Sequence, residues 1–209
     1  MPQLRLTYFD SPGRAEPLRI ALHIAGIPFE DRRVKFPEFA ALKATLPLGS
    51  LPVLEVDGRA MAQTGAMLRY AAHLGGAKLY PTDPWAAFVV DSVIDTFNDT
   101  VSHALMPSLF ERELSKKIEM RKAVLAGPLG ASLRYVEGLL NDSAGPFLTG
   151  ADLTIADIIL GLTVQQYRAG VFDGLGPDVL EPYPKLRALG DAYAAHPGVV
   201  AYNNRGSAA

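Results

Sequence analysis

Residues 4–26, LRLTYFDSPGRAEPLRIALHIAG, hold a strand, a turn and a helix in close succession. Apolar and polar residues alternate from Leu4 to Tyr8, and this period of two predicts a half-buried strand. Turn-forming residues follow at 10–13, after which apolar residues recur at helical spacing as far as Gly26, a residue typical of helix C-termini. The chain is therefore expected to open with a β-α unit.

The alternation of strands and helices continues beyond this unit. The patterns predict a strand at 29–34, a short helix at 36–44 and two antiparallel strands at 51–56 and 59–61. Between the last two strands, Asp57-Gly58 is a strong signal for a two-residue hairpin turn. Thr64 stands where the N-cap of another helix is expected, and Gly75-Gly76 end that helix. The order over residues 1–77 is thus β-α-β-α-β-β-α.

A proline-containing stretch at 78–82 has no periodicity and is typical of a linker. The remainder, 83–209, is expected to be an all-helical domain. Its helices are predicted at 85–110, 112–126, 128–142, 154–168 and 184–195. Thr154 and Asp157 have the spacing of an N-capping box, which assigns them a structural role at the start of one of these helices.

Composition excludes several classes of function. Of the 209 residues, 49% are hydrophobic and 20% are charged, which is typical of a globular protein with a core. The absence of cysteine excludes disulfides, thiolate metal sites and a protein thiol nucleophile, so any sulfur chemistry must use a sulfur atom from the ligand. No signal-peptide core and no apolar run of about 18 residues is present, so we expect a soluble cytoplasmic protein without a membrane anchor.

Charge is distributed unevenly along the chain. Residues 1–80 hold 10 Lys/Arg against 7 Asp/Glu, whereas residues 81–209 hold 10 against 15. The excess of three positive charges in the first part suits a small anion but is too slight for nucleic acid. The four histidines are too scattered for a metal site or a Ser-His-Asp triad. We therefore expect neither a metal nor a nucleic-acid partner.

Four segments occur in the order and at the spacing of one protein family. They are YFDSPGRAEPLR at 8–19, LPVL at 51–54, Gln63-Thr64, and TIAD at 154–157. Together they resemble a cytosolic glutathione S-transferase over essentially the whole chain, most closely the sigma class, with the alpha, mu and pi classes as near alternatives. The resemblance implies an α/β thioredoxin-like domain at 1–77 that binds glutathione, and an all-α domain at 83–209 that lines a pocket for an electrophile.

The implied reaction is addition of the glutathione thiolate to a small hydrophobic electrophile by a homodimer. Two alternatives stay open. One is a glutathione-dependent isomerase of the prostaglandin D synthase type, and the other is a non-catalytic crystallin or ligand carrier. Retention of Tyr8, Arg14 and Gln63-Thr64 argues against the second alternative, because a purely structural protein has no physical need of them.

The resemblance implies that Tyr8 and Arg14 are the catalytic residues. A phenol is a poor base towards a thiol, but its O–H is a good donor to a thiolate. Lowering a thiol pKa from about 9 to about 6.5 requires roughly 3.4 kcal/mol, of which one hydrogen bond to a charged acceptor supplies about 1.5 to 3. We expect Arg14 and the N-terminus of the helix that starts near Ala15 to supply the remainder.

The resemblance also implies a set of residues that bind glutathione. A cis Leu51-Pro52 bond would turn its backbone towards the cysteinyl part, and the helix N-terminus at Gln63-Thr64 would bind the γ-glutamyl carboxylate. Three more residues fall at the glycyl end: Phe39, Lys43 and Ser50. Phe39 and Ser50 stand where related enzymes often have tryptophan and glutamine, which predicts weaker or rearranged binding at that end.

Residues of the helical domain complete the implied site. Asp99 would cross the dimer interface to the glutamyl ammonium of the other subunit. The electrophile pocket would be lined by Phe9, Val101, Met106, Ile159 and Thr163. Asp91, Asp95, Asn98 and Asp99 also resemble the acidic cluster that binds a divalent ion in prostaglandin D synthase, but Asn98 replaces a carboxylate and we expect no metal.

Overall fold

The computed structural model describes residues 1–76 and 79–205, and of Ser102 only the backbone. Contacts divide the chain into two compact units, residues 1–80 with 201–209 and residues 81–200. The expected linker at 78–82 lies partly outside the described residues, as do Ala77 and residues 206–209. The residues from Ala201 onward group with the first unit rather than with the helices that precede them.

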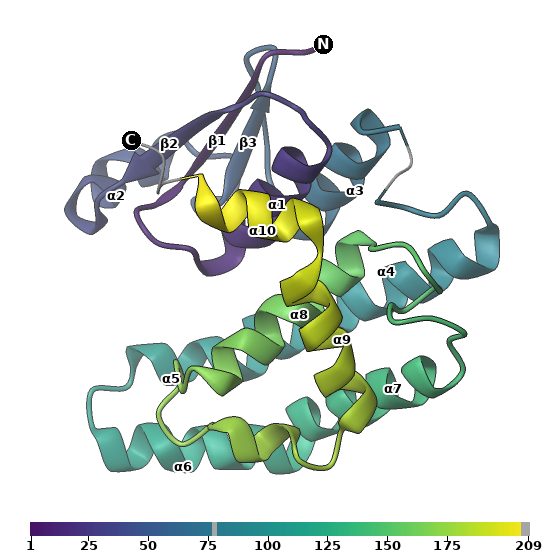
Figure 1. The fold of residues 1–209 in the computed structure, drawn as a ribbon. Coiled ribbons are helices and arrows are strands. Elements are labelled where there is room, and N and C mark those ends of the chain that lie inside the picture. Colours follow the sequence, from purple (N-terminus) through teal and green to yellow (C-terminus); the bar gives the residue numbers. More distant parts are fainter. Residues whose placement is uncertain (77–78, 206–209) are drawn as a thin grey trace. The chain divides into compact units, whose positions relative to one another are not determined.

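A four-stranded mixed sheet forms the centre of the first unit (Figure 1). The strands are β1 (Leu4–Phe9), β2 (Glu30–Val34), β3 (Val53–Val56) and β4 (Arg59–Met61), in the order β2-β1-β3-β4. β1 pairs parallel with β2 and antiparallel with β3, which pairs antiparallel with β4. The predicted hairpin is confirmed, because Asp57 and Gly58 have φ values of 49° and 79°, the left-handed conformations that a type I′ turn requires.

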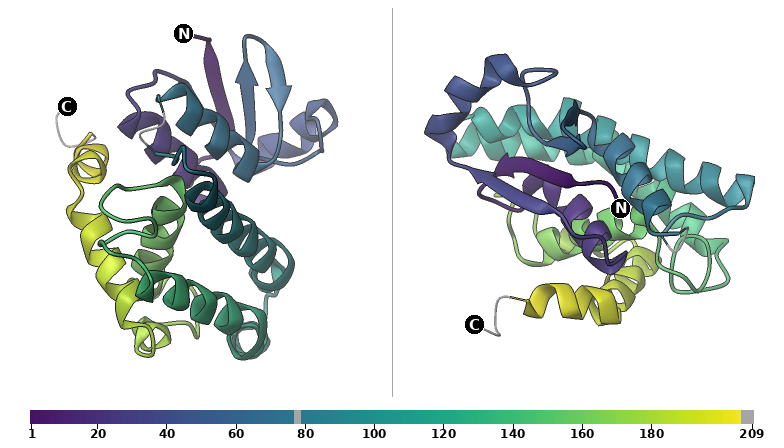
Figure 2. Two further views of the ribbon diagram at one scale, coloured as in Figure 1. Left: turned by 90° about the vertical axis from the view of Figure 1, so that its right-hand side faces the viewer. Right: turned by 90° about the horizontal axis from the view of Figure 1, so that it is seen from above.

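Helices α1 (Glu16–Ile24) and α3 (Thr64–Leu74) pack against each other beside the sheet (Figures 1 and 2). Their apolar stripes meet the inward residues of β1 and β3. The centre of this core is fully or almost fully buried: Leu6, Leu18, Leu22, Leu54 and Leu68. By contrast, α2 (Phe36–Leu42), which continues into a 3₁₀ turn at Lys43–Thr45, contains no buried residue.

The second unit consists of helices and their connections. They are α4 (Pro84–Asp99), α5 (Met106–Phe110), α6 (Leu114–Val124), α7 (Gly130–Asn141), α8 (Ile155–Arg168), a 3₁₀ turn at Pro177–Leu180, α9 (Pro184–Ala195) and the start of α10 (Pro197–Asn204). An all-α domain is therefore confirmed. Helix α10 was not predicted, because Pro197 and Gly198 are typical of turns. Proline is tolerated here because it stands at the first helical position.

One boundary differs from the prediction because the helical winding changes. The expected helix at 85–110 widens into a π-helical segment, η3 (Thr100–Leu105), where the N–H of Met106 donates to the carbonyl of Val101. Pro107 follows at once and lacks the N–H that a regular helix would need. The predicted break at Gly127-Pro128 is confirmed: Gly127 has non-helical dihedral angles (φ −108°, ψ −112°), so a kink within η4 (Leu125–Leu129) separates α6 from α7.

The predicted N-capping box begins α8 and is confirmed. The Thr154 N–H donates to Asp157 Oδ2 over 2.8 Å, and the Asp157 N–H donates back to Thr154 Oγ1 over 3.4 Å. Asp157 also accepts from the Leu148 N–H, so it fastens the preceding loop to the helix. In the part of the chain that the structure describes, no helix is both long and apolar enough to span a membrane.

Candidate active site

Tyr8 lies near the end of β1 with 8% of its surface exposed, and its hydroxyl oxygen accepts the backbone N–H of Arg14 over 3.1 Å. The loop comes this close because of Gly13. Its φ is +45°, and a Cβ atom at this position would lie 2.5 Å from the Tyr8 hydroxyl oxygen. A residue without a side chain therefore brings the loop and the phenol together.

The Arg14 side chain connects this loop to the one before β3. Its Nη2 donates to the carbonyl of Leu51 over 2.6 Å. The Leu51–Pro52 peptide bond is cis, as the resemblance implied, and both residues are buried. Tyr8 and Arg14 thus meet the Leu51–Pro52 segment, although Leu51 lies 37 residues after Arg14.

A residue that the sequence analysis missed, Arg19, lies at the same place. Its guanidinium is 1% exposed and donates to the carbonyls of Ser11 and Pro12 and to the carboxylates of Glu16 and Asp31. Its guanidinium carbon is 5.8 Å from the centre of the Tyr8 ring. The spacing of Glu16 and Arg19 on one helix predicts an ion pair, but no local signal indicates burial beside Tyr8.

The start of α3 differs in detail from the prediction. Gln63, not Thr64, is the N-cap, because its carbonyl accepts the N–H of Met67 and its φ of 77° and ψ of 105° are not helical. Thr64 is the first helical residue, and no side chain caps the helix. No side chain among residues 1–76 and 79–205 caps the first turn, and a helix start of this kind can bind a carboxylate.

Residues expected at the glycyl end of glutathione lie on and after α2. Phe39 is half-buried with its ring edge-on to Phe9, at a centroid distance of 5.2 Å. Phe36 stacks on the Phe9 ring itself, with a centroid distance of 4.8 Å and an interplanar angle of 15°. Lys43 is exposed and lies against Gly49, next to the half-buried Ser50. The structure thus gathers these residues in one unit.

The remaining predicted residues belong to the second unit. Asp99 ends α4, is 80% exposed and lies 3.9 Å from His103 Nδ1. Ile159 and Thr163 occupy successive turns of α8, where the Thr163 hydroxyl donates to the Ile159 carbonyl. Val101 and Met106 are half-buried on η3 and α5. Because Phe9 belongs to the first unit, the electrophile pocket remains a prediction.

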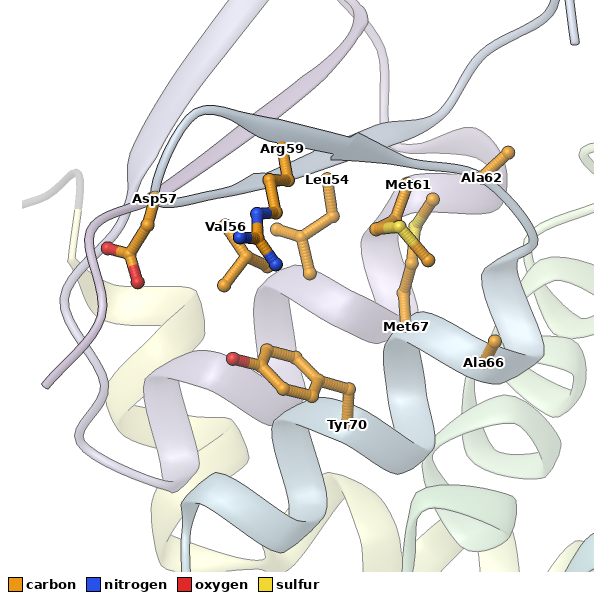
Figure 3. Close-up of a pocket in the computed structure, with 9 residues that line it drawn as sticks. All are labelled: Leu54, Val56, Asp57, Arg59, Met61, Ala62, Ala66, Met67 and Tyr70. Atoms are coloured by element: carbon orange, nitrogen blue, oxygen red, sulfur yellow. The ribbon is translucent and has the colours of Figure 1, made fainter. Parts of the chain in front are cut away.

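A cavity of about 560 Å³ lies elsewhere in the first unit, between the β3–β4 hairpin and α3 (Figure 3). Its walls are mostly apolar, and Arg59, Asp57 and Tyr70 add polar groups. None of its lining residues belongs to the predicted glutathione site. Within residues 1–76 and 79–205, no three His, Cys, Asp or Glu side chains are grouped to hold a metal ion, and the acidic residues of α4 do not form such a group.

The fold and the site define a class of protein: a thioredoxin-like unit with a cis-proline before β3, followed by an all-α unit. Comparison with known proteins gives the family. Residues 4–73 match the glutathione S-transferase N-terminal domain, and residues 98–206 match the glutathione S-transferase C-terminal domain. The chain belongs to the glutathione S-transferase family, whose co-substrate is glutathione.

Curated and solved relatives agree with this assignment. Glutathione S-transferase S1 of Drosophila melanogaster is 36% identical over 91% of this chain and 73% of its own length. Hematopoietic prostaglandin D synthase of Gallus gallus is 31% identical over 97% of this chain and 96% of its own. The structure of monomeric Na-GST-3, a glutathione S-transferase from Necator americanus, has a TM-score of 0.83 and 27% identity, covering 97% and 96% of the two chains.

Proposed function

We propose that this glutathione transferase holds the sulfur of bound glutathione as a thiolate beside Tyr8 and adds it to small hydrophobic electrophiles. One observation carries the proposal. In the described part of the chain, the Tyr8 hydroxyl accepts the Arg14 N–H, so its own proton is left to donate. A buried phenolic proton aimed at an anion stabilises that anion more than a solvated one does.

Positive charge around the phenol supports the same role. The Arg14 N–H polarises the hydroxyl directly, and helix α1 begins two residues later with its positive end. Lowering the thiol pKa from about 9 to about 6.5 requires roughly 3.4 kcal/mol, and these contributions would supply the part that one hydrogen bond does not. The cis peptide at Leu51–Pro52 and the uncapped start of α3 would bind the cysteinyl and γ-glutamyl parts, with Phe39, Lys43 and Ser50 at the glycyl end.

The test compares conjugation of glutathione to 1-chloro-2,4-dinitrobenzene by the wild type and by Tyr8→Phe. We expect Tyr8→Phe to lose most of its rate near neutral pH and to raise the apparent kinetic pKa towards that of the free thiol, with little change in glutathione affinity. Tyr135→Phe is the matched control, because it removes a hydroxyl that is hydrogen-bonded to Ser92 in the second unit. An unchanged pH profile in Tyr8→Phe would refute the role of Tyr8.

The chicken relative favours a second candidate, a glutathione-dependent isomerase in which the same thiolate attacks an endoperoxide. Assay of a prostaglandin endoperoxide beside the dinitrobenzene substrate separates the two reactions. Glutathione binding without turnover of either substrate would favour a crystallin or ligand carrier. We also infer membership of the sigma class, which the name of the Drosophila relative supports, and a cytoplasmic location, where glutathione is kept reduced.

We further propose that the protein is a homodimer in which α4 of one subunit contacts the first unit of its partner. α4 exposes two large rings one turn apart, Trp85 (70%) and Phe88 (61%), and carries acidic residues at 91, 95 and 99. The cavity in Figure 3 offers an apolar complement with the exposed Arg59 at its edge. Asp99 would then reach the glutamyl ammonium of glutathione in the other subunit.

Sedimentation equilibrium tests the dimer. We expect the wild type to sediment as a dimer and a Trp85→Glu, Phe88→Glu double variant to dissociate. Leu114→Glu, which replaces another exposed apolar residue, is the control. A monomeric wild type, as described for the Necator americanus protein, would overturn this proposal and the role of Asp99 with it.

A further inference from the structure

Arg19 holds the loop that carries Gly13 and Arg14. Its Nη1 donates to the carbonyl of Ser11 over 2.9 Å and to that of Pro12 over 3.2 Å. These are the two residues before Gly13, whose close approach to Tyr8 sets the position of the Arg14 N–H. The orientation of the Arg19 guanidinium therefore determines how the loop meets the phenol.

Two carboxylates fix that orientation. Glu16 Oε2 lies 3.0 Å from Nη1, and Asp31 Oδ1 on β2 lies 3.0 Å from Nε. A guanidinium that is 1% exposed needs such partners, because an unpaired buried charge is very costly. Its Nη2 is buried without a hydrogen-bond partner among the described residues, and the guanidinium carbon faces the Tyr8 ring at 5.8 Å.

The C-terminal segment completes this arrangement. Tyr202 of α10 donates its hydroxyl proton to Glu16 Oε1 over 2.7 Å, so each oxygen of Glu16 has one partner. The Tyr202 ring is 4% exposed and is held by His23 on one side and by the Arg205 guanidinium, 3.2 Å from its centre. Burial, together with the Glu16 carboxylate, raises the pKa of Tyr202 far above its usual range, so this hydroxyl keeps its proton.

We propose that Tyr202 is a positioning residue for thiolate formation: through Glu16 and Arg19 it fixes the 11–14 loop against Tyr8. The inference rests on the proposed role of Tyr8. It gives helix α10 a part in catalysis, although Tyr202 lies 186 residues after Glu16 along the chain. The loop would still form without the Tyr202 hydroxyl, but Glu16, and with it Arg19, would sample several orientations.

Tyr202→Phe tests the proposal, because it removes one hydroxyl and keeps the ring. A loop that is less well ordered should raise the apparent pKa of the bound thiol by about half a unit, which lowers kcat/KM about twofold near pH 6.5. Near pH 9, where the thiol ionises unaided, the variant should approach the wild-type rate. Tyr135→Phe, which loses a comparable hydroxyl hydrogen bond to Ser92, should keep the wild-type profile.

A second experiment separates positioning from general destabilisation. In a Tyr8→Phe background, Tyr202→Phe should have no further effect on the pH profile, because its path ends at the Tyr8 hydroxyl. Glu16→Gln keeps an acceptor for Tyr202 but weakens the hold on Arg19, so it should shift the profile at least as far. A wild-type profile in folded Tyr202→Phe, or an equal loss of rate at every pH, overturns the inference. A wild type that conjugates nothing overturns the proposed function instead.

Discussion

The backbone N–H of Arg14 donates to the hydroxyl oxygen of Tyr8, and the residue before Arg14, Gly13, lies so close to the phenol that it has no room for a side chain. The two facts belong together. A hydroxyl that already accepts one strong donor is oriented with its proton pointing elsewhere, and only a glycine at φ +45° lets the loop reach it. The position of the phenolic proton of Tyr8 is thus set by a residue that has no functional group.

Gly13→Ala should therefore impair catalysis more than stability. The new Cβ would press on the Tyr8 hydroxyl oxygen and on two ring carbons, and alanine is disfavoured at this φ. Displacement of the phenol should lower kcat about tenfold or more, whereas the free energy of unfolding should fall by only about 1 to 2 kcal/mol. Steady-state kinetics and urea denaturation measure the two effects. A variant with wild-type kcat would show that the hydroxyl position is not critical.

Thr64→Ala should separate capping from ligand binding. Because Gln63 is the N-cap and Thr64 makes no capping hydrogen bond, loss of its hydroxyl should change the free energy of unfolding by less than about 0.5 kcal/mol. Glutathione affinity should fall severalfold if the hydroxyl meets the γ-glutamyl carboxylate. Isothermal titration with glutathione gives the affinity, and a drop in stability typical of a lost N-cap, about 1 kcal/mol, would contradict the assignment of the cap.

Short sequence patterns predicted those parts of the structure that depend on interactions between residues close together in the chain. The Asp57-Gly58 hairpin and the Thr154 to Asp157 capping box each depend on residues within a few positions of one another, and both occur as predicted. Tyr8 and Arg14 could be named as candidate site residues because they belong to a segment that resembles the family, and their role stays a prediction. The cap at α3 could not be placed, because nothing in the sequence indicates a φ of 77° at a glutamine.

Long-range features escaped prediction for a physical reason. The burial of Arg19 depends on Asp31 and on the carbonyls of a loop, and Tyr202 reaches Glu16 from the opposite end of the chain. Neither residue has a periodic or local signal for its role. The wide turn at η3 likewise results from how the helix accommodates Pro107, because proline alone predicts a break rather than a change of winding.

Asp157 should make stability depend on pH in an unusual direction. Burial raises its pKa to about 6, although hydrogen bonds from Thr154 and Leu148 oppose the shift. In the unfolded chain the pKa of this carboxyl is near 4, so between about pH 4 and 6 the folded state binds one proton that the unfolded state does not. The contribution of Asp157 to the free energy of unfolding therefore falls as the pH rises through this range. Above about pH 6 the contribution stays constant.

Asp157→Asn cannot titrate and should lack this slope. Urea denaturation at several pH values from 4.5 to 7 should show the wild type losing stability relative to the variant as the pH rises. Parallel curves for the two proteins would mean that Asp157 titrates alike in the folded and unfolded states. The variant itself should be less stable at low pH, because an amide satisfies the Thr154 and Leu148 donors with one oxygen where the carboxyl has two.

The contact between α8 and α9 offers a matched pair of glycine substitutions. A Cβ on Gly161 would collide with the ring of the buried Tyr193, whereas a Cβ on Gly138 of α7 would meet nothing within 4 Å. Both glycines lie in helices, so both substitutions gain the same helical preference, about 0.5 to 1 kcal/mol. Overpacking against Tyr193 should turn this gain in stability into a loss at Gly161 but not at Gly138. We expect Gly138→Ala to raise the free energy of unfolding slightly and Gly161→Ala to lower it by at least about 2 kcal/mol. Thermal unfolding of the two variants measures the difference, and equal melting temperatures would show that Tyr193 moves aside at little cost.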